Sequence, residues 1–308
     1  MIELVVIIPV YNEEKAIQKN FSIIYQTLLK DQISCHFMIV DDGSSDQTWS
    51  KICEIINKYN HVSALRFARN FGKEIALCAG IDHIQAKRYL LMDSDLQHPP
   101  QYVKNMITLM NQTKVNIVHG VKKKRGKEKL AYTFIAKSFY KLLQLTTGLH
   151  LDNSSDFKLI DAQVANSIRQ FKERNLFFRG IIDWVGFKSA TYHFEVKERR
   201  NGSSRFSTIK LIQLAFNSII SYTHKPLYLT IIGGVIFFFI SIILGIQTLV
   251  RYFLGHSLNG FSTIILLLLF IGSMIMFSLG IIGIYISRIY DEVKQRPRYI
   301  ISKKIKRL

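Results

Sequence analysis

Two long stretches without a charged residue constrain this 308-residue chain more than any other feature. They run from Pro226 to Val250 and from Phe261 to Ser287. A helix needs about 20 apolar residues to cross the roughly 30 Å of hydrocarbon in a bilayer, and each stretch is longer than that. A buried core helix is the alternative, but two such stretches in succession favour membrane spans. We therefore predict a two-helix transmembrane hairpin over residues 226–287.

The basic residues around these spans predict their orientation. The net charge of +19 suits either a nucleic acid or an anionic membrane surface. Lys and Arg accumulate before the first span and after the second, whereas the connection between the spans carries only Arg251. Cytoplasmic flanks hold such an excess of basic residues. We therefore expect a multi-pass protein of the plasma or inner membrane, with both termini cytoplasmic and with no nucleic-acid partner.

The first two hundred residues alternate short apolar runs with helical patterns. Continuous apolar strands between helices are typical of a mainly parallel α/β sheet that is covered on both faces. Ligands of such sheets bind beyond the carboxyl ends of the strands. Strands are expected at 3–9, 35–41, 62–68, 88–93 and 116–121, and helices at 13–30, 46–60, 73–84 and 100–112.

Polar clusters follow four of these strands in turn. Any one of them alone would be an ordinary turn, but four at one edge of the sheet indicate a binding site. A usual dinucleotide site or a P-loop is disfavoured, because the sequence has no GxGxxG after the first strand and no GxxxxGK[ST]. The clusters read PVYNEE (9–14), DDGSSDQT (41–48), RNFGKE (69–74) and MDSDLQHPP (92–100).

The carboxylates of Asp93 and Asp95 suggest the chemistry of this site. Two such hard oxygen ligands at a strand end suit Mg²⁺ or Mn²⁺ holding a diphosphate. A divalent ion would bridge both phosphates and stabilise charge on the leaving group, which a lysine does not do. Asp41, Asp42 and the turn at 11–13 are placed to hydrogen-bond a base and a ribose.

The four clusters, followed by two C-terminal spans, resemble the family 2 glycosyltransferases with the GT-A fold, a Rossmann-like nucleotide-sugar-binding domain. The chain is most similar to the polyprenyl-phosphate glycosyltransferases, which include dolichyl-phosphate mannose synthases and bacterial undecaprenyl-phosphate glucosyltransferases. The resemblance covers nearly the whole chain. It implies a membrane-bound inverting enzyme that moves a sugar from a nucleotide sugar, with a UDP-linked donor favoured, to a polyprenyl phosphate.

The resemblance also implies roles for individual residues. Asp42 would contact the base, and Asp93, Asp95 and Gln97 would hold Mg²⁺ or Mn²⁺. Asp156, in SSDFKLID (154–161), would join Asp95 at the catalytic centre, although it could instead be a helix cap or turn acid. We expect Asp156 to orient the acceptor or to act as an optional base. The nucleotide-sugar-binding residues would be Pro9, Tyr11, Asn12, Glu13, Asp41, Asp42, Lys73, Asp93 and Ser94.

The segment before the first span suggests how an acceptor is held. Its basic stretch KERRNGSSRFS (197–207) is similar to one in the family. The resemblance implies that a lipid phosphate is gripped through charge-assisted bonds, although the same arginines could be positive-inside flanks without a ligand. Residues 207–225 have the pattern of an interfacial helix, or else of a core helix packed on the sheet. The lipid-phosphate-binding residues would be Arg199, Arg200, Ser203 and Arg205.

These features divide the chain into four parts. A cytosolic catalytic domain is expected over 1–206, the amphipathic helix over 207–225, the hairpin over 226–287 and a basic cytosolic tail over 288–308. Glycines and serines in the spans permit close approach of helices. We therefore expect a homo-oligomer, with a tetramer as one candidate.

Other functions remain open. A processive polysaccharide synthase would normally carry a QxxRW motif, and neither Trp49 nor Trp184 follows an arginine. A nucleotidyltransferase should have a Gly-rich basic loop after the first strand, where this chain has PVYNEE. A membrane scaffold that lost catalysis is disfavoured by the intact Asp93, Asp95 and Gln97. A transferase acting on a glycan or glycolipid would show the same donor motifs.

Overall fold

The computed structural model describes residues 2–122, 156–171, 173, 178–195, 225–254 and 260–306. Within it the chain forms two compact units. One unit holds the sheet with its helices and includes the C-terminal residues Pro297–Leu308. The other holds the two long apolar helices, within Phe206–Arg296. The expected interfacial helix at 207–225 lies outside the described residues, apart from Lys225, where the first long helix begins.

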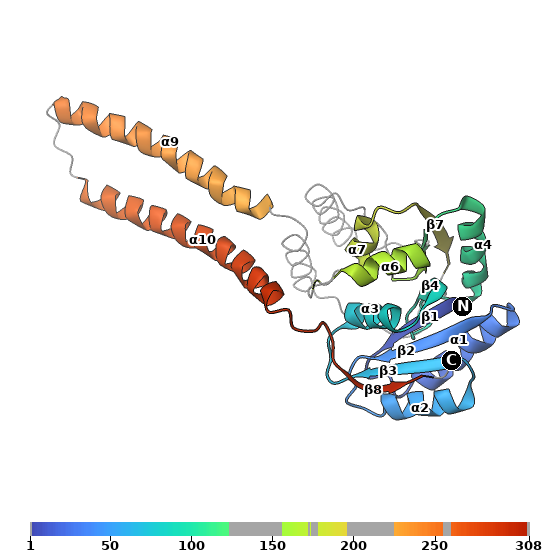
Figure 1. Ribbon diagram of the computed structural model, residues 1–308. Coiled ribbons are helices and arrows are strands. Elements are labelled where there is room, and N and C mark those ends of the chain that lie inside the picture. The colour runs from blue at the N-terminus through green and yellow to red at the C-terminus, as the bar shows by residue number, and fades with distance from the viewer. Residues whose placement is uncertain are drawn as a thin grey trace. The chain divides into compact units, whose positions relative to one another are not determined.

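The first unit is built on an eight-stranded sheet with the order β7-β5-β6-β4-β1-β2-β3-β8 (Figure 1). Strands β6 and β8 run antiparallel to their neighbours, and the other described pairs are parallel. This confirms the expected mainly parallel α/β sheet. The strands are β1 (Ile2–Val10), β2 (Cys35–Asp41), β3 (Val62–Phe67), β4 (Ala86–Leu91), β5 (Ile117–Lys122), β6 (Lys158–Asp161), β7 (Ser189–Phe194) and β8 (Ile301–Ile305).

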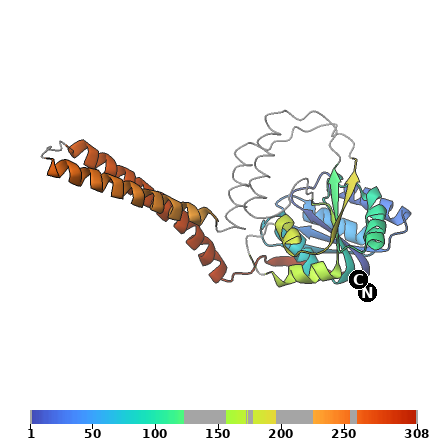
Figure 2. The same ribbon diagram turned by 90° about the horizontal axis from the view of Figure 1, so that it is seen from above.

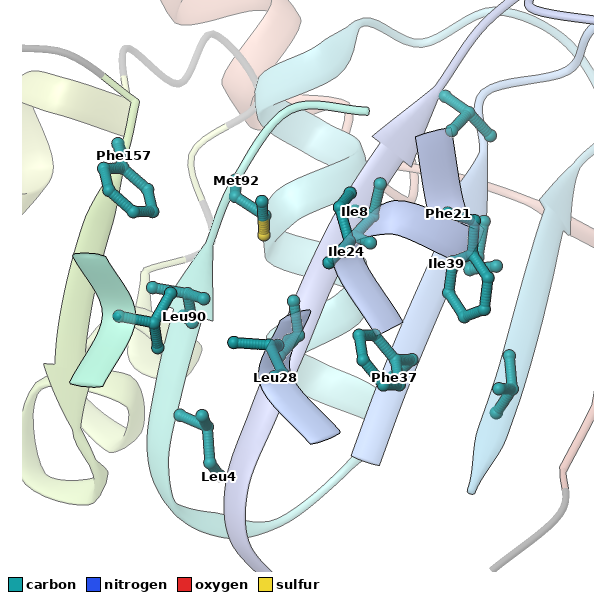
Figure 3. Packing of buried hydrophobic residues seen from close by; sticks show 14 of the residues in the cluster. Leu4, Ile8, Phe21, Ile24, Leu28, Phe37, Ile39, Leu90, Met92 and Phe157 are labelled. Atoms are coloured by element: carbon teal, nitrogen blue, oxygen red, sulfur yellow. The ribbon is translucent and has the colours of Figure 1, made fainter. Parts of the chain in front are cut away.

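Helices cover both faces of this sheet, as Figure 2 shows. One apolar core joins α1, α2 and α4 to one face, and a second core joins α3, α6 and α7 to the other. Figure 3 shows the first core, where Ile24 of α1 lies beside Ile8 of β1. The helices are α1 (Ile17–Lys30), α2 (Thr48–Lys58), α3 (Lys73–His83), the 3₁₀ turn η1 (Pro100–Tyr102) with α4 (Val103–Thr113), α6 (Ala162–Gln170) and α7 (Phe178–Trp184).

The five predicted strands are present, but α1 begins at Ile17 rather than at residue 13. Residues 13–16 form a turn, in which the Glu13 carbonyl accepts the N–H groups of Ala16 and Ile17. The N–H of Glu13 donates to Thr48 Oγ1 at the start of α2. A long-range contact therefore fixes this turn, and the local helical pattern could not reveal it.

The end of the chain differs from the expected basic tail at 288–308. Residues Ile301–Ile305 form β8, which pairs antiparallel with β3 at the edge of the sheet (Figure 1). The sequence ISKKI gives little indication of a strand. Its three middle residues Ser302, Lys303 and Lys304 are all polar and exposed, so apolar and polar residues do not alternate along it. Lysines on an edge strand also discourage pairing with another chain. The sheet domain therefore includes residues on both sides of the two apolar helices.

The second unit consists of α9 (Lys225–Phe253) and α10 (Phe261–Val293). Thr230–Arg251 and Leu267–Val293 are long and apolar enough to cross a membrane, and neither stretch is buried within the chain. The rings of Phe237 and Phe270 lie 4.9 Å apart between the two helices. The chain therefore has two helices that could span a membrane, and α10 continues beyond the predicted limit at 287.

Candidate active site

The carboxyl ends of β1, β2 and β4, together with the loop after β3, surround a pocket of about 310 Å³. The site lies beside the point where the strand order reverses around β1, which is where open α/β sheets bind ligands. It brings together residues from all four predicted clusters. The lining residues are Pro9, Val10, Tyr11, Glu13, Asp42, Asn70, Gly72, Lys73, Asp93, Ser94 and Asp95.

The turn after β1 is held by hydrogen bonds from the turn after β2. Asn12 has a left-handed backbone conformation, with φ of 52°. Its N–H donates to Ser44 Oγ at 2.9 Å, and its Oδ1 accepts the N–H of Ser45 at 2.9 Å. Asn12 therefore shapes the pocket wall without lining it, and its neighbours Tyr11 and Glu13 face the pocket.

The last residue of β2, Asp41, and the residue that follows it, Asp42, have different environments. Asp42 lines the pocket, and its carboxylate accepts the N–H groups of Phe71 at 2.7 Å and Gly72 at 2.9 Å. Burial raises the pKa of Asp42, although these two N–H groups oppose the rise. Asp41 is fully buried and does not line the pocket; it accepts the N–H of Ser44 and pairs with Arg66. Asp41 therefore supports the loop rather than lining the pocket.

The Asp-Ser-Asp segment after β4 is the acidic part of the pocket. Ser94 donates its hydroxyl to Glu13 at 2.7 Å, which joins the turns after β1 and β4. Asp95 Oδ1 accepts the N–H of Gln97 at 3.0 Å, across a turn in which Leu96 has φ of 61°. Gln97 does not line the pocket. Burial raises the pKa of Glu13, and the nearby carboxylates of Asp95 and Asp93 add to this effect.

Lys73, the first residue of α3, connects two carboxylates, one from the segment after β4 and one from just before β6. Its Nζ lies 2.6 Å from Asp93 Oδ1 and 2.7 Å from Asp156 Oδ2. Burial alone would lower the pKa of Lys73, but the negative charges of Asp93 and Asp156 outweigh it and raise that pKa. Asp156 of the predicted segment SSDFKLID is thus brought to the acidic segment, although it comes 61 residues after Asp95 in the chain.

The charges that line the pocket favour a cation. Among the described lining residues, Glu13, Asp42, Asp93 and Asp95 are acidic and Lys73 is basic. The part of the chain that the structure describes contains no group of three His, Cys, Asp or Glu side chains arranged to hold a metal ion. Mg²⁺ is commonly bound by one or two carboxylates, with substrate phosphates and water completing its shell. The Asp93–Asp95 pair fits a metal of that kind.

His98 was not assigned a role from the sequence, yet it positions the acidic segment. Its Nδ1 accepts the N–H of Asp93 at 2.9 Å, and its ring stacks on Phe157 with centroids 5.1 Å apart. Burial lowers the pKa of His98, which favours the neutral ring that accepts this bond. In the sequence, His98 and the two prolines that follow it indicated only a turn. The contact of the His98 ring with Phe157 could not be seen there, because Phe157 lies far away in the chain. Asn70 and Gly72 also line the pocket without having been singled out.

Arg199, Arg200, Ser203 and Arg205 lie outside the described residues, so their relation to the pocket stays a prediction.

Comparison with known proteins shows which family this chain is similar to. The family model "Glycosyl transferase family 2" matches residues 5–169. The putative glycosyltransferase CsbB of Bacillus subtilis is 34% identical over 96% of this chain and 90% of its own length. The SfII prophage-derived bactoprenol glucosyl transferase of Shigella flexneri is 34% identical over 96% of each protein.

Two solved structures share the fold at low sequence identity. Mannosyl-3-phosphoglycerate synthase from Rubrobacter xylanophilus aligns with a TM-score of 0.52 at 13% identity, over 73% of this chain and 75% of that one. Glucosyl-3-phosphoglycerate synthase from Mycobacterium tuberculosis aligns with a TM-score of 0.50 at 18% identity, over 71% and 78%. The sheet unit is a GT-A-like α/β domain. The family match and the full-length relatives together show that this chain belongs to glycosyl transferase family 2.

Proposed function

We propose that this protein transfers a sugar from a nucleotide sugar to a polyprenyl phosphate at the cytoplasmic face of a membrane. The observation that carries the proposal is the acidic strand-end pocket in a chain that also has two apolar helices of membrane-spanning length. A relative named as a bactoprenol glucosyl transferase, similar over 96% of this chain, supports a lipid acceptor of this class. A UDP-linked donor is favoured.

The donor would lie along the pocket from β2 toward β4. Asp42, with its carboxylate fixed by two backbone N–H groups, would accept hydrogen bonds from the base. The turn at Tyr11 and Glu13 would border the ribose. The diphosphate would lie near Asp93 and Asp95, which would hold Mg²⁺ or Mn²⁺. Such an ion would neutralise negative charge on the departing diphosphate.

The reaction would be a single displacement with inversion at the anomeric carbon. An oxygen of the lipid phosphate forms a bond to that carbon, while the bond from the carbon to the diphosphate breaks and the nucleoside diphosphate leaves with the electron pair. A phosphate monoester has a second pKa of about 6 and is largely dianionic at neutral pH. The acceptor therefore needs orientation and charge compensation more than removal of a proton.

This requirement suits the environment of Asp156. Its carboxylate accepts a hydrogen bond from the Lys73 ammonium at 2.7 Å, so it is already paired with a cation. We propose that Asp156 orients groups at the reacting centre, with action as a base optional. The basic residues Arg199, Arg200 and Arg205, with Ser203, would bind the acceptor phosphate.

A purified preparation tests this function directly. Radiolabelled nucleotide sugars are each offered with undecaprenyl phosphate, with dolichyl phosphate, or with a glycan or glycolipid acceptor. The expected result is a sugar-labelled polyprenyl phosphate formed from one donor and dependent on the lipid phosphate. Transfer only to a glycan or glycolipid would replace the proposed acceptor. Growth of a long polymer would indicate a processive synthase.

The acceptor contact gives a separate prediction. Replacing Arg200 or Arg205 by Ala should raise the KM for polyprenyl phosphate roughly ten- to hundredfold, because each loses a charge-assisted bond of about 1.5–3 kcal/mol. The KM for the nucleotide sugar should change little. Lys at either position should restore binding only partly, because an ammonium cannot make the bidentate contact of a guanidinium. Both KM values are measured on protein recovered from membranes.

The matched control for this experiment is Arg251→Ala, which changes the basic residue in the predicted outer connection. It should leave both KM values unchanged. If Arg200 and Arg205 are only positive-inside flanks, their Ala variants will behave like Arg251→Ala and alter only membrane insertion.

The apolar unit supports a proposal about assembly. A Cβ added to Gly233 would lie 1.9 Å from Met274 Cε, so this glycine permits contact between α9 and α10. A Cβ at Gly245, Gly272 or Gly280 would meet no other described atom within 4 Å. Such small residues allow close helix contacts, and we expect a homo-oligomer in mild detergent, measured as mass by light scattering. A fully active monomer would contradict this.

A further inference from the structure

The segment that follows the second apolar helix returns to the sheet domain and docks there through polar contacts. Arg298 Nη2 lies 3.3 Å from Asp82 Oδ2 near the end of α3, and the two side chains are only 13% and 18% exposed. The hydroxyl of Tyr299 donates to the same Asp82 oxygen at 3.0 Å. Two consecutive residues therefore converge on one carboxylate, which fixes the point where the chain rejoins the sheet.

Apolar and backbone contacts continue this docking along the end of β3. The ring of Tyr299 stacks on Phe67, with centroids 5.2 Å apart and planes 17° from parallel. The N–H of Ala68 donates to the Ile300 carbonyl at 2.9 Å. The hydroxyl of Ser302 lies 3.1 Å from the Arg66 carbonyl oxygen and 3.2 Å from that of Phe67, where the pairing of β3 with β8 is irregular. The C-terminal segment thus holds the last residues of β3.

Those last residues of β3 lead directly into the pocket wall. Phe67 also contacts Phe71 edge-on, with centroids 5.6 Å apart. Phe71 and Gly72 supply the two N–H groups that bind Asp42, and Asn70 and Gly72 line the pocket. A series of contacts therefore runs from Tyr299 through Phe67 and Phe71 to Asp42.

The second support of this loop comes from the turn after β2. Gly43 has φ of 70°, and a Cβ there would lie 2.3 Å from the Arg69 carbonyl carbon. The Arg69 guanidinium lies over the Phe71 ring at 4.8 Å. The loop at residues 68–72 is therefore held between the β2 turn on one side and the ring of Phe67 on the other, and Tyr299 covers that ring.

We infer that Tyr299 is a positioning residue for donor binding, acting through Phe67 and Phe71 on the loop that orients Asp42. The inference rests on the proposed donor site and adds to it a residue from beyond both apolar helices. Tyr299 itself does not line the pocket. Tyr299 raises the fraction of molecules in which loop 68–72 has the conformation that binds the donor, and its removal lowers that fraction. If that fraction falls to about a tenth, the apparent Kd rises about tenfold.

The experiment compares Tyr299→Ala with Tyr299→Phe in the full-length protein. Binding of UDP and of GDP in the presence of Mg²⁺ is measured by calorimetry, together with the KM for donor and for acceptor. We expect Tyr299→Ala to raise the nucleotide Kd and the donor KM about tenfold, because the ring on Phe67 is lost. Tyr299→Phe keeps the ring and should stay within about twofold of wild type. The acceptor KM should change little in either.

Two control variants separate positioning from general stability. Ile168→Ala removes a buried side chain of α6 from the core on the same face of the sheet, and it should lower the thermal midpoint without changing the nucleotide Kd. Lys304→Ala changes an exposed residue of β8 itself and should alter neither.

Three outcomes would overturn the inference about Tyr299 without affecting the proposed donor site. They are an unchanged donor KM in Tyr299→Ala, an equal rise of its donor and acceptor KM, and the same rise of nucleotide Kd in Ile168→Ala. A wild-type protein that binds neither nucleotide would overturn the proposed donor site, and the inference with it.

Discussion

Replacing Asp95 by Asn is expected to lower the turnover number at least about 100-fold, a loss typical for a group that stabilises charge in the transition state. The side chain lines the pocket beside Asp93 and Ser94. Asn removes the negative charge that a divalent ion and the leaving diphosphate require. It keeps an oxygen that accepts the N–H of Gln97, so the turn at Leu96 should persist. Turnover at saturating substrate and the thermal midpoint are the two measurements.

The control for this substitution is Asp31→Asn, which removes a carboxylate at the C-terminal end of α1. It should leave turnover unchanged. Excess EDTA should reduce wild-type activity to the level of Asp95→Asn, and added Mg²⁺ or Mn²⁺ should restore the wild type but not the variant. Full wild-type activity in chelator would contradict the metal proposal, even if Asp95 proved essential.

The sheet was predictable because its central strands carry a strong local pattern. β1 is buried on both faces, with Leu4, Val6 and Ile8 in one core and Val5 and Ile7 in the other. Such a strand appears in the sequence as an unbroken apolar run, and the polar residues at its end are then placed by the rule for parallel sheets. The pocket residues from the first four motifs follow from that rule.

The strands β6 and β8 were missed because their pattern depends on distant partners. β6 is four residues long, and β8 is rich in lysine. Each becomes a strand only by pairing with residues far away in the chain, β6 with β4 and β5 and β8 with β3. The hydrophobic periodicity within one segment gives no information about such pairings.

The difference between Asp41 and Asp42 has a similar origin. Alternation along a strand places neighbouring side chains on opposite faces, but the sequence does not say which face opens into the pocket. The answer depends on Arg66, which pairs with Asp41, and on the loop at 71–72, which binds Asp42. Arg66 lies on β3, and residues 71–72 lie in the loop that follows β3. The roles of Asp41 and Asp42 therefore depend on contacts between strands that only the folded sheet shows.

Replacing Lys73 by Met is the second substitution with a large expected effect. Met has similar length but no charge, so Asp93 and Asp156 lose the ammonium that lies within 2.7 Å of each. The negative charges of the pocket would then repel the diphosphate and leave Asp156 without its orienting partner. We expect the ratio kcat/KM for the nucleotide sugar to fall at least about 100-fold. The thermal midpoint should change little, because a partly exposed ion pair contributes at most about 1 kcal/mol.

The affinity of Lys73→Met for Mg²⁺ should rise although its activity falls. Removing a positive charge beside Asp93 reduces electrostatic repulsion of a divalent cation, so the Mg²⁺ concentration for half-maximal residual activity should fall. The control is Lys51→Met on α2, where Lys51 pairs with Glu54 at the surface and neither quantity should change. If Lys73 instead bound only the donor phosphates, the requirement for Mg²⁺ would not fall when activity is lost. A lower Mg²⁺ requirement together with a lower kcat/KM would therefore indicate that Lys73 shares the carboxylate of Asp93 with the metal site.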